Sequence, residues 1–126
     1  MSNHGKIFIP DHEYKERVAR AAKILQREKL DVMIVNSNEA DYANARYFSG
    51  FWPLFERSGV AISASGDAAL MVGPESREFA ADRSRLEKIF VLKEYRESAD
   101  PAYPELKAQF LSVSYTHLTL PTILLV

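Results

Sequence analysis

The apolar positions near the start of the chain follow helical spacing and then give way to a strand pattern. Within residues 11–29, apolar side chains recur three and four positions apart, which places them on one face of an amphipathic helix. The residues of this face are Val18, Ala21, Ala22 and Leu25. Asp11 can accept hydrogen bonds from the first free amides, so it is predicted as the N-cap. The run 31–35 is short, apolar and β-branched, which is typical of a buried strand.

The middle of the chain predicts a short helix followed by a hairpin. Ser37 or Asn38 can cap the short helix, because both side chains accept hydrogen bonds from free backbone amides. Residues 59–63 and 68–72 have the composition of strands. The segment 64–67 between them contains turn-forming residues, which favours an antiparallel hairpin.

The pattern after the hairpin predicts a second helix, another strand and a last helix. Gly73 and the proline after it end the hairpin, and Ser76 can cap the helix that follows. Residues 89–92 are apolar and predict a buried strand, while Pro104 can be the first residue of a further helix. This order of elements predicts an α/β domain with a mixed β-sheet and flanking helices.

The composition is that of one globular domain without special partners. The chain has 126 residues, of which 47% are hydrophobic, enough for one core but too few for two domains. The formal net charge of −1 gives no basic excess for nucleic acid, and the lack of cysteine excludes disulfides. The polar start has no signal-peptide apolar run, and no stretch has the length of a membrane span. We therefore expect a cytoplasmic protein with no nucleic-acid or membrane partner.

The segment 113–126 differs from the rest of the chain, because it contains no Asp, Glu, Lys or Arg. On residue types alone, it favours a buried strand. Residues 113–122 also resemble the translation of a transposase-based sequencing adaptor. We therefore expect the natural domain in residues 1–112 and a non-native tail in residues 113–126. Tyr115 and His117 are assigned no role.

No catalytic or metal-binding constellation can be recognised before this tail. Hydrolysis requires an activated nucleophile, a pair of positioned carboxylates or a metal site. The sequence contains no His-Glu-x-x-His, Gly-x-Ser-x-Gly or phosphate-loop motif. Asp11, His12 and Glu13 have metal-binding groups, but adjacent residues at a helix start point in different directions, so helix capping is favoured. Glu39 and Asp41 are predicted as a solvated helix start. We predict no catalytic residue and no metal ligand here.

An aromatic segment, residues 47–57, stands between the short helix and the hairpin. Tyr47 and Phe48 are predicted to lean toward the core, whereas Trp52 and Phe55 are predicted at the surface. Exposed aromatic residues are enriched at binding surfaces. The alternative is that these rings only pack under the sheet and cover its edge.

Arg57 lies at the end of the aromatic segment and allows two interpretations. Its planar guanidinium can hold a carboxylate through paired hydrogen bonds, as a binding residue would. Alternatively, it pairs only with Glu56 or with solvent.

Several of these features occur in an order that is characteristic of one family. The amphipathic helix carries Arg17 and Leu25, and the strand at 30–35 follows it. Then come Tyr-Phe-Ser-Gly-Phe at 47–51 and a hairpin that ends in Gly-Pro-Glu at 73–75. Together these features, over residues 13–112, resemble the amino-terminal domain of the creatinase, prolidase and aminopeptidase P family.

This resemblance implies a domain that does no chemistry itself. Family members place a smaller α/β domain before a pita-bread catalytic domain. In the peptidases, the second domain holds two divalent metal ions (Mn, Co or Zn), which activate a water molecule. The chain would then be truncated before that domain. It would have no metal or cofactor of its own and would be an inactive fragment of a parent Xaa-Pro peptidase-like hydrolase.

The resemblance also implies a role in assembly. In this family the amino-terminal domain mediates dimer or tetramer contacts, and its aromatic loop reaches the substrate site of a neighbouring subunit. Trp52, Phe55 and Arg57 are therefore the candidates for contacts in trans with a peptide or small amide substrate. The alternative is a non-enzymatic protein- or peptide-binding module, since the domain is also similar to one in the large subunit of the FACT histone chaperone. The neutral charge and compact length favour the enzyme.

Overall fold

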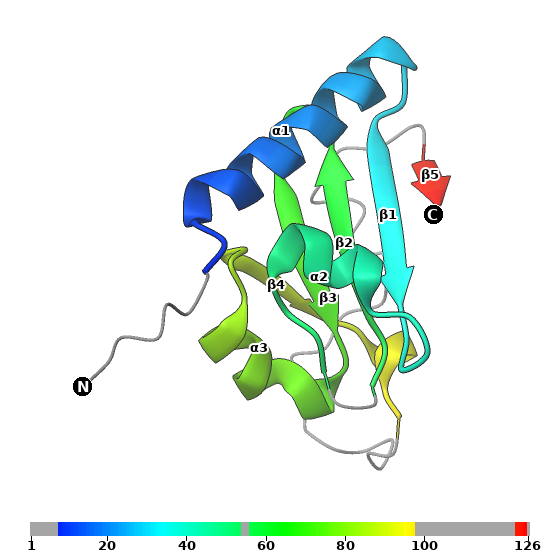
Figure 1. Cartoon of the computed structure of the whole chain (residues 1–126). Coiled ribbons are helices and arrows are strands. Elements are labelled where there is room, and N and C mark those ends of the chain that lie inside the picture. Colours follow the sequence, from blue (N-terminus) through cyan, green and yellow to red (C-terminus); the bar gives the residue numbers. More distant parts are fainter. Residues whose placement is uncertain (1–7, 54–55, 98–122, 126) are drawn as a thin grey trace, which may run out of the picture.

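A mixed β-sheet with helices packed on it forms the domain. The computed structural model describes residues 8–53 and 56–97, together with the backbone of 123–125. The strands form a five-stranded sheet in the order β4-β3-β2-β1-β5 (Figure 1). Their bounds are β1 Val32–Ser37, β2 Ser58–Ser63, β3 Ala68–Val72, β4 Lys88–Val91 and β5 Ile123–Leu125. The helices are α1 Asp11–Arg27, α2 Ala43–Ser49 and α3 Arg77–Arg83, with 3₁₀ turns η1 Pro74–Ser76 and η2 Lys93–Tyr95.

The sheet combines antiparallel and parallel pairs, which confirms the predicted α/β fold. β2 pairs antiparallel with β1 and with β3. β4 pairs parallel with β3, and β5 pairs parallel with β1. The predicted hairpin is therefore β2–β3, and its turn contains Gly66 at a φ of 94°, a conformation that favours glycine.

Apolar residues are buried on both faces of the sheet. α1 and α2 lie across one face in Figure 1, and the predicted stripe of α1 packs there. The core on this side includes Val18, Leu25, Val35, Val60, Ile62, Leu70 and Val72. Residues of the opposite face form a second buried cluster, because successive side chains of a strand alternate between faces. This cluster consists of Val32, Ile34, Ala61, Met71, Leu92 and Tyr95.

The start of α1 differs from the prediction that Asp11 is its N-cap. Pro10 occupies the N-cap with an extended backbone, and its carbonyl accepts from the Glu13 amide at 3.0 Å. Asp11 is the first helical residue instead, and its carboxylate accepts from Arg85 Nη1 at 2.8 Å. The reason is that this long-range cation draws the carboxylate away from the helix amides, while Pro10 lacks an amide hydrogen and suits the helix boundary.

The short helix α2 begins later than a cap at Ser37 or Asn38 would place it. The side-chain oxygen of Asn38 accepts from the Ala40 and Asp41 amides, at 2.9 and 3.1 Å, and so forms a turn where a cap was expected. Asp41 then accepts from the Ala43 amide at 2.9 Å, next to the actual helix start. Ser37 does bind the helix, but from β1, by accepting from the Ala45 amide at 2.9 Å.

The remaining predicted elements agree with the structure where it describes them. Ser76 stands at the N-cap of α3, although its side chain makes no capping hydrogen bond. The predicted strand at 89–92 is β4, one residue earlier. β5 agrees with the strand that residue types favour in the tail, while the adaptor origin of residues 113–126 stays a prediction. The helix expected at Pro104 lies outside the described residues. In the part of the chain that is described, no helix is both long and apolar enough to cross a membrane.

The close approach of Gly73, directly after β3, to the backbone of Tyr95 in η2 gives a first prediction. A Cβ atom added at Gly73 would lie only 2.3 Å from the carbonyl oxygen of Tyr95, a backbone atom that cannot rotate away. We expect Gly73→Ala to lower the free energy of unfolding by about 1–3 kcal/mol, because the chain must shift to relieve the overlap. Urea denaturation measures this. Glu78→Ala, on the exposed surface of α3, is the control and should change stability by less than about 0.5 kcal/mol. Equal stability of the two variants would contradict the close approach.

Candidate functional site

The candidate site lies where α2 ends and the chain turns toward β2. Gly50 adopts a left-handed conformation with φ of 69°, which ends the helix. The hydroxyl of Ser49 donates to the Ala45 carbonyl at 2.6 Å and accepts from the Phe51 amide at 3.1 Å. These bonds set the direction in which the chain leaves the helix. Phe51 consequently enters the core, whereas the next side chain, Trp52, faces outward.

Trp52 is exposed, as predicted, and it is stacked against a cation. Its side chain is 43% exposed, and the guanidinium carbon of Arg46 lies 4.0 Å from the ring centroid. Arg46 belongs to α2, whereas Trp52 follows the end of that helix, so the stacking joins the helix to the segment after it. Pro53, directly after the ring, is buried. The arrangement presents a large apolar ring with a positive charge beside it, which suits an anionic or carboxylate-bearing partner.

The other two predicted site residues do not join Trp52 in a single cluster. Phe55 lies outside the described residues. The side chain of Arg57 is 67% exposed and pairs with Glu97, with 3.8 Å between Nε and Oε1. An exposed pair of that length contributes little to stability and can exchange its partner. Glu56, the alternative partner of Arg57, is buried.

Tyr47 contradicts the prediction that it leans toward the core. It belongs to α2 rather than to a loop, and 45% of its surface is exposed. The reason is helical geometry. Ala45 and Ser49 are four residues apart and take the buried face of α2, so Tyr47 between them points away. Phe48 is half-buried and packs edge-on against the Tyr47 ring, with centroids 4.9 Å apart.

Arg17 forms a junction around Tyr47 that the sequence did not reveal. Its Nη1 donates to the Tyr47 carbonyl at 2.8 Å, and its Nε donates to Glu13 at 3.0 Å. Its guanidinium carbon lies 4.3 Å from the centroid of the Tyr47 ring and 5.2 Å from that of Tyr14. The hydrogen bond from Arg17 lowers the pKa of the Glu13 carboxyl. One side chain therefore joins α1 to the carboxyl-terminal end of α2, directly before the segment 50–57, which is the candidate loop.

The metal ions implied for a whole peptidase find no fitting ligand set in the described part of the chain. No group of three or more His, Cys, Asp or Glu residues gathers there. Among the metal-capable residues at the start of α1, Asp11 pairs with Arg85 and Glu13 pairs with Arg17. We derive no step that involves a metal in this domain.

Comparison with known proteins identifies a family model and solved structures that are similar to this chain. The family model described as the creatinase/prolidase N-terminal domain matches residues 17–121. This match runs past Ser112 into the segment that was predicted to be a non-native tail. No curated protein sequence matches the chain at a significant level.

Solved structures with the same fold include both whole enzymes and isolated domains. The prolidase from Pyrococcus horikoshii is 23% identical over 62% of this chain and 20% of its own, with a TM-score of 0.53. The N-terminal domain of a Corynebacterium diphtheriae protein described as a metallopeptidase is 16% identical over 90% of this chain and 94% of its own, with a TM-score of 0.53. A Streptococcus pyogenes Xaa-Pro aminopeptidase structure is 12% identical over 93% and 94%, with a TM-score of 0.55. At these identities the likeness shows the fold, and the chain spans about a fifth of the prolidase.

The Arg17 junction gives a second prediction. Lysine lacks the planar fork that contacts a carbonyl, a carboxylate and an aromatic face together. We expect Arg17→Lys to lower the free energy of unfolding by about 1–2 kcal/mol, because a partly buried hydrogen bond and the ring stacking are lost. Thermal or urea denaturation measures this.

Arg20→Lys is the matched control. Arg20 also faces Glu13 and Tyr47, but its side chain is 54% exposed and its contacts are long, at 3.4 and 3.5 Å. Its replacement should leave the midpoint of denaturation nearly unchanged, because exposed and long contacts contribute little to stability. If both variants were equally stable, the junction at Arg17 would not hold α1 to α2.

Proposed function

The chain belongs to the creatinase/prolidase N-terminal domain family, and on that premise we propose that it is the non-catalytic, amino-terminal part of a larger hydrolase of the Xaa-Pro-peptidase or creatinase type. Its role in that protein is to mediate homo-oligomerisation, as a dimer, and to complete the substrate site of a neighbouring subunit. The substrate is a peptide or a small amide. The two divalent metal ions belong to the catalytic domain of the larger protein.

One observation carries this proposal: Trp52 is held in an exposed position by rigid neighbours. The ring is fixed by the left-handed turn at Gly50 before it, by buried Pro53 after it and by the stacked Arg46. A side chain that is already held in one position loses little conformational entropy when a partner covers it. In addition, Trp and Arg are enriched among the residues that contribute most of the binding energy at interfaces. Trp52 is therefore suited to contact a second molecule.

Arg57 adds a charge that a substrate or a partner subunit can use. It lies just before β2, and its long pair with Glu97 leaves the guanidinium largely in solvent. Such a group can bind the carboxylate end of a peptide through paired hydrogen bonds. Trp52, Phe55 and Arg57 together are the residues that we assign to contacts in trans.

The contact in trans can be tested in the larger protein that contains this domain. Trp52→Ala and Arg57→Ala should each lower kcat/KM for a proline-containing peptide by about tenfold or more, because a central aromatic or arginine contact contributes about 2 kcal/mol. Ile24→Ala, which removes another exposed apolar side chain from α1, is the control and should leave kcat/KM unchanged.

Subunit mixing distinguishes action in trans from action within one subunit. A Trp52→Ala subunit, whose activity alone is lowered about tenfold, is combined with an inactive subunit that lacks a metal ligand in its catalytic domain. A mixed dimer has one intact catalytic site next to one intact Trp52, and activity should return on mixing if the contact is in trans. No recovery in verified mixed dimers would show that Trp52 acts within its own subunit. Absence of hydrolysis by the larger protein itself would favour the binding-module alternative.

The 126-residue chain alone should not hydrolyse proline-containing peptides when Mn²⁺, Co²⁺ or Zn²⁺ is added. The physical reason is that the described residues supply no set of ligands that could hold an activating metal. Release of amino acid from such a peptide, measured by chromatography, would contradict the assignment if it persisted through repeated purification.

A further inference from the structure

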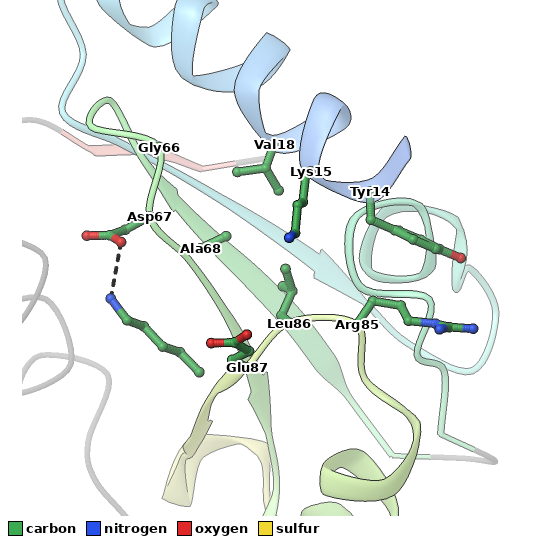
Figure 2. Close-up of a pocket in the computed structure, with 10 residues that line it drawn as sticks. Tyr14, Lys15, Val18, Gly66, Asp67, Ala68, Arg85, Leu86 and Glu87 are labelled. Carbon is green, nitrogen blue, oxygen red and sulfur yellow. Dashed lines mark ion pairs between the residues drawn. The ribbon is translucent and has the colours of Figure 1, made fainter. Parts of the chain in front are cut away.

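A cavity lies away from the candidate loop, between α1 and the segment that leads into β4. Its volume is about 310 Å³, and the β2–β3 turn closes one side of it (Figure 2). Val18, Ala68 and Leu86 provide apolar side chains inside it, while charged residues line its edge. A cavity of this size is at the lower end of the range for small-molecule sites, which is about 300–1,000 Å³.

Two charged pairs at the edge of the cavity are already satisfied. Lys88 binds Asp67, with 3.2 Å between Nζ and Oδ1, and Figure 2 shows Asp67 next to Gly66 of the turn. Arg85 binds Asp11 at 2.8 Å, and its guanidinium points away from the cavity. Asp67, Arg85 and Lys88 line the cavity, but the charges of Asp67 and Lys88 are directed at each other and that of Arg85 is directed at Asp11, outside the lining.

Lys15 and Glu87 are the two charged residues that remain for a ligand. Figure 2 shows Lys15 extending from α1 into the space above Leu86, with the Glu87 carboxylate on the other side. Neither side chain has an ion pair or hydrogen bond to another residue within the described ranges 8–53 and 56–97. An ammonium and a carboxylate thus face a small cavity with an apolar interior.

We propose that this cavity binds a free aliphatic α-amino acid in its zwitterionic form. Lys15 binds the carboxylate of the ligand, and Glu87 binds its ammonium group, each through charge-assisted hydrogen bonds. The aliphatic side chain packs against Val18, Ala68 and Leu86. The two opposite charges exclude ligands that carry only one sign, such as phosphates. Because both charged residues are exposed to solvent, the affinity is in the millimolar range, roughly 4 kcal/mol of binding free energy.

The test is a titration of the ¹⁵N-labelled 126-residue chain with L-leucine, followed by amide chemical shifts. N-acetyl-L-leucinamide, which keeps the side chain but lacks both charges, is the matched ligand. Saturable shifts at the Val18, Ala68 and Leu86 amides are expected with leucine and not with the neutral analogue. Absence of saturable shifts, or equal binding of the neutral analogue, would overturn the proposal.

Charge-removing variants test the roles of the two residues. Lys15→Met and Glu87→Gln should each raise the Kd for leucine by about threefold to tenfold, as expected for the loss of one exposed charge-assisted contact. Lys23→Met on α1 and Glu78→Gln on α3 remove the same charges elsewhere and should leave the Kd unchanged. All four residues are exposed, so the variants should keep the native amide spectrum. Unchanged affinity in both cavity variants would refute the assigned contacts.

Discussion

The turn at Ser49 and Gly50 is the constraint on which the rest of the domain depends. Three separate parts of the chain meet there. The carbonyl of Ser49 accepts from the Arg85 amide at 2.8 Å, and a Cβ atom at Gly50 would lie 3.0 Å from the hydroxyl oxygen of Tyr14 in α1. Only a residue without a side chain combines this close contact with a left-handed backbone. The turn therefore decides how α1, α2 and the segment before β4 fit together.

The turn at Ser49 and Gly50 also sets the positions of both sites. On one side, it directs Phe51 into the core and Trp52 to the surface, which creates the exposed ring of the candidate loop. On the other side, Tyr14 and Arg85 form part of the lining of the cavity below α1. Arg17, which joins α1 to the end of α2, strengthens the same meeting point. The contacts around this turn thus position two different surfaces. One carries the exposed Trp52 ring, and the other carries the opposite charges of Lys15 and Glu87.

Within the described ranges 8–53 and 56–97, several surface cations contact aromatic rings or carboxylates. Arg46 is stacked on the Trp52 ring, and Arg85 is paired with Asp11. Such arrangements favour recognition of planar and charged groups over proton transfer. The chain also matches a family of amino-terminal domains over residues 17–121.

The sequence by itself determined the elements whose signals are local. Hydrophobic spacing over a few residues was enough to predict three features. They are the apolar face of α1, the hairpin with Gly66 and the strand at 89–92. The surface position of Trp52 was also predicted correctly, as an amphipathic ring beside backbone-breaking residues. The family resemblance came from the order of these same local features.

The tertiary structure alone decided the contacts between distant residues. Asp11 was expected to cap its own helix, but Arg85, 74 positions away, competes for its carboxylate. Tyr47 was expected near the core, but the extension of α2 turned it outward toward Arg17, 30 positions earlier. The cavity likewise brings together Lys15 in α1 and Glu87 before β4, which are far apart in the sequence. Long-range electrostatic and stacking contacts leave no periodic signal in one sequence, because they depend on where whole elements pack rather than on neighbouring residues.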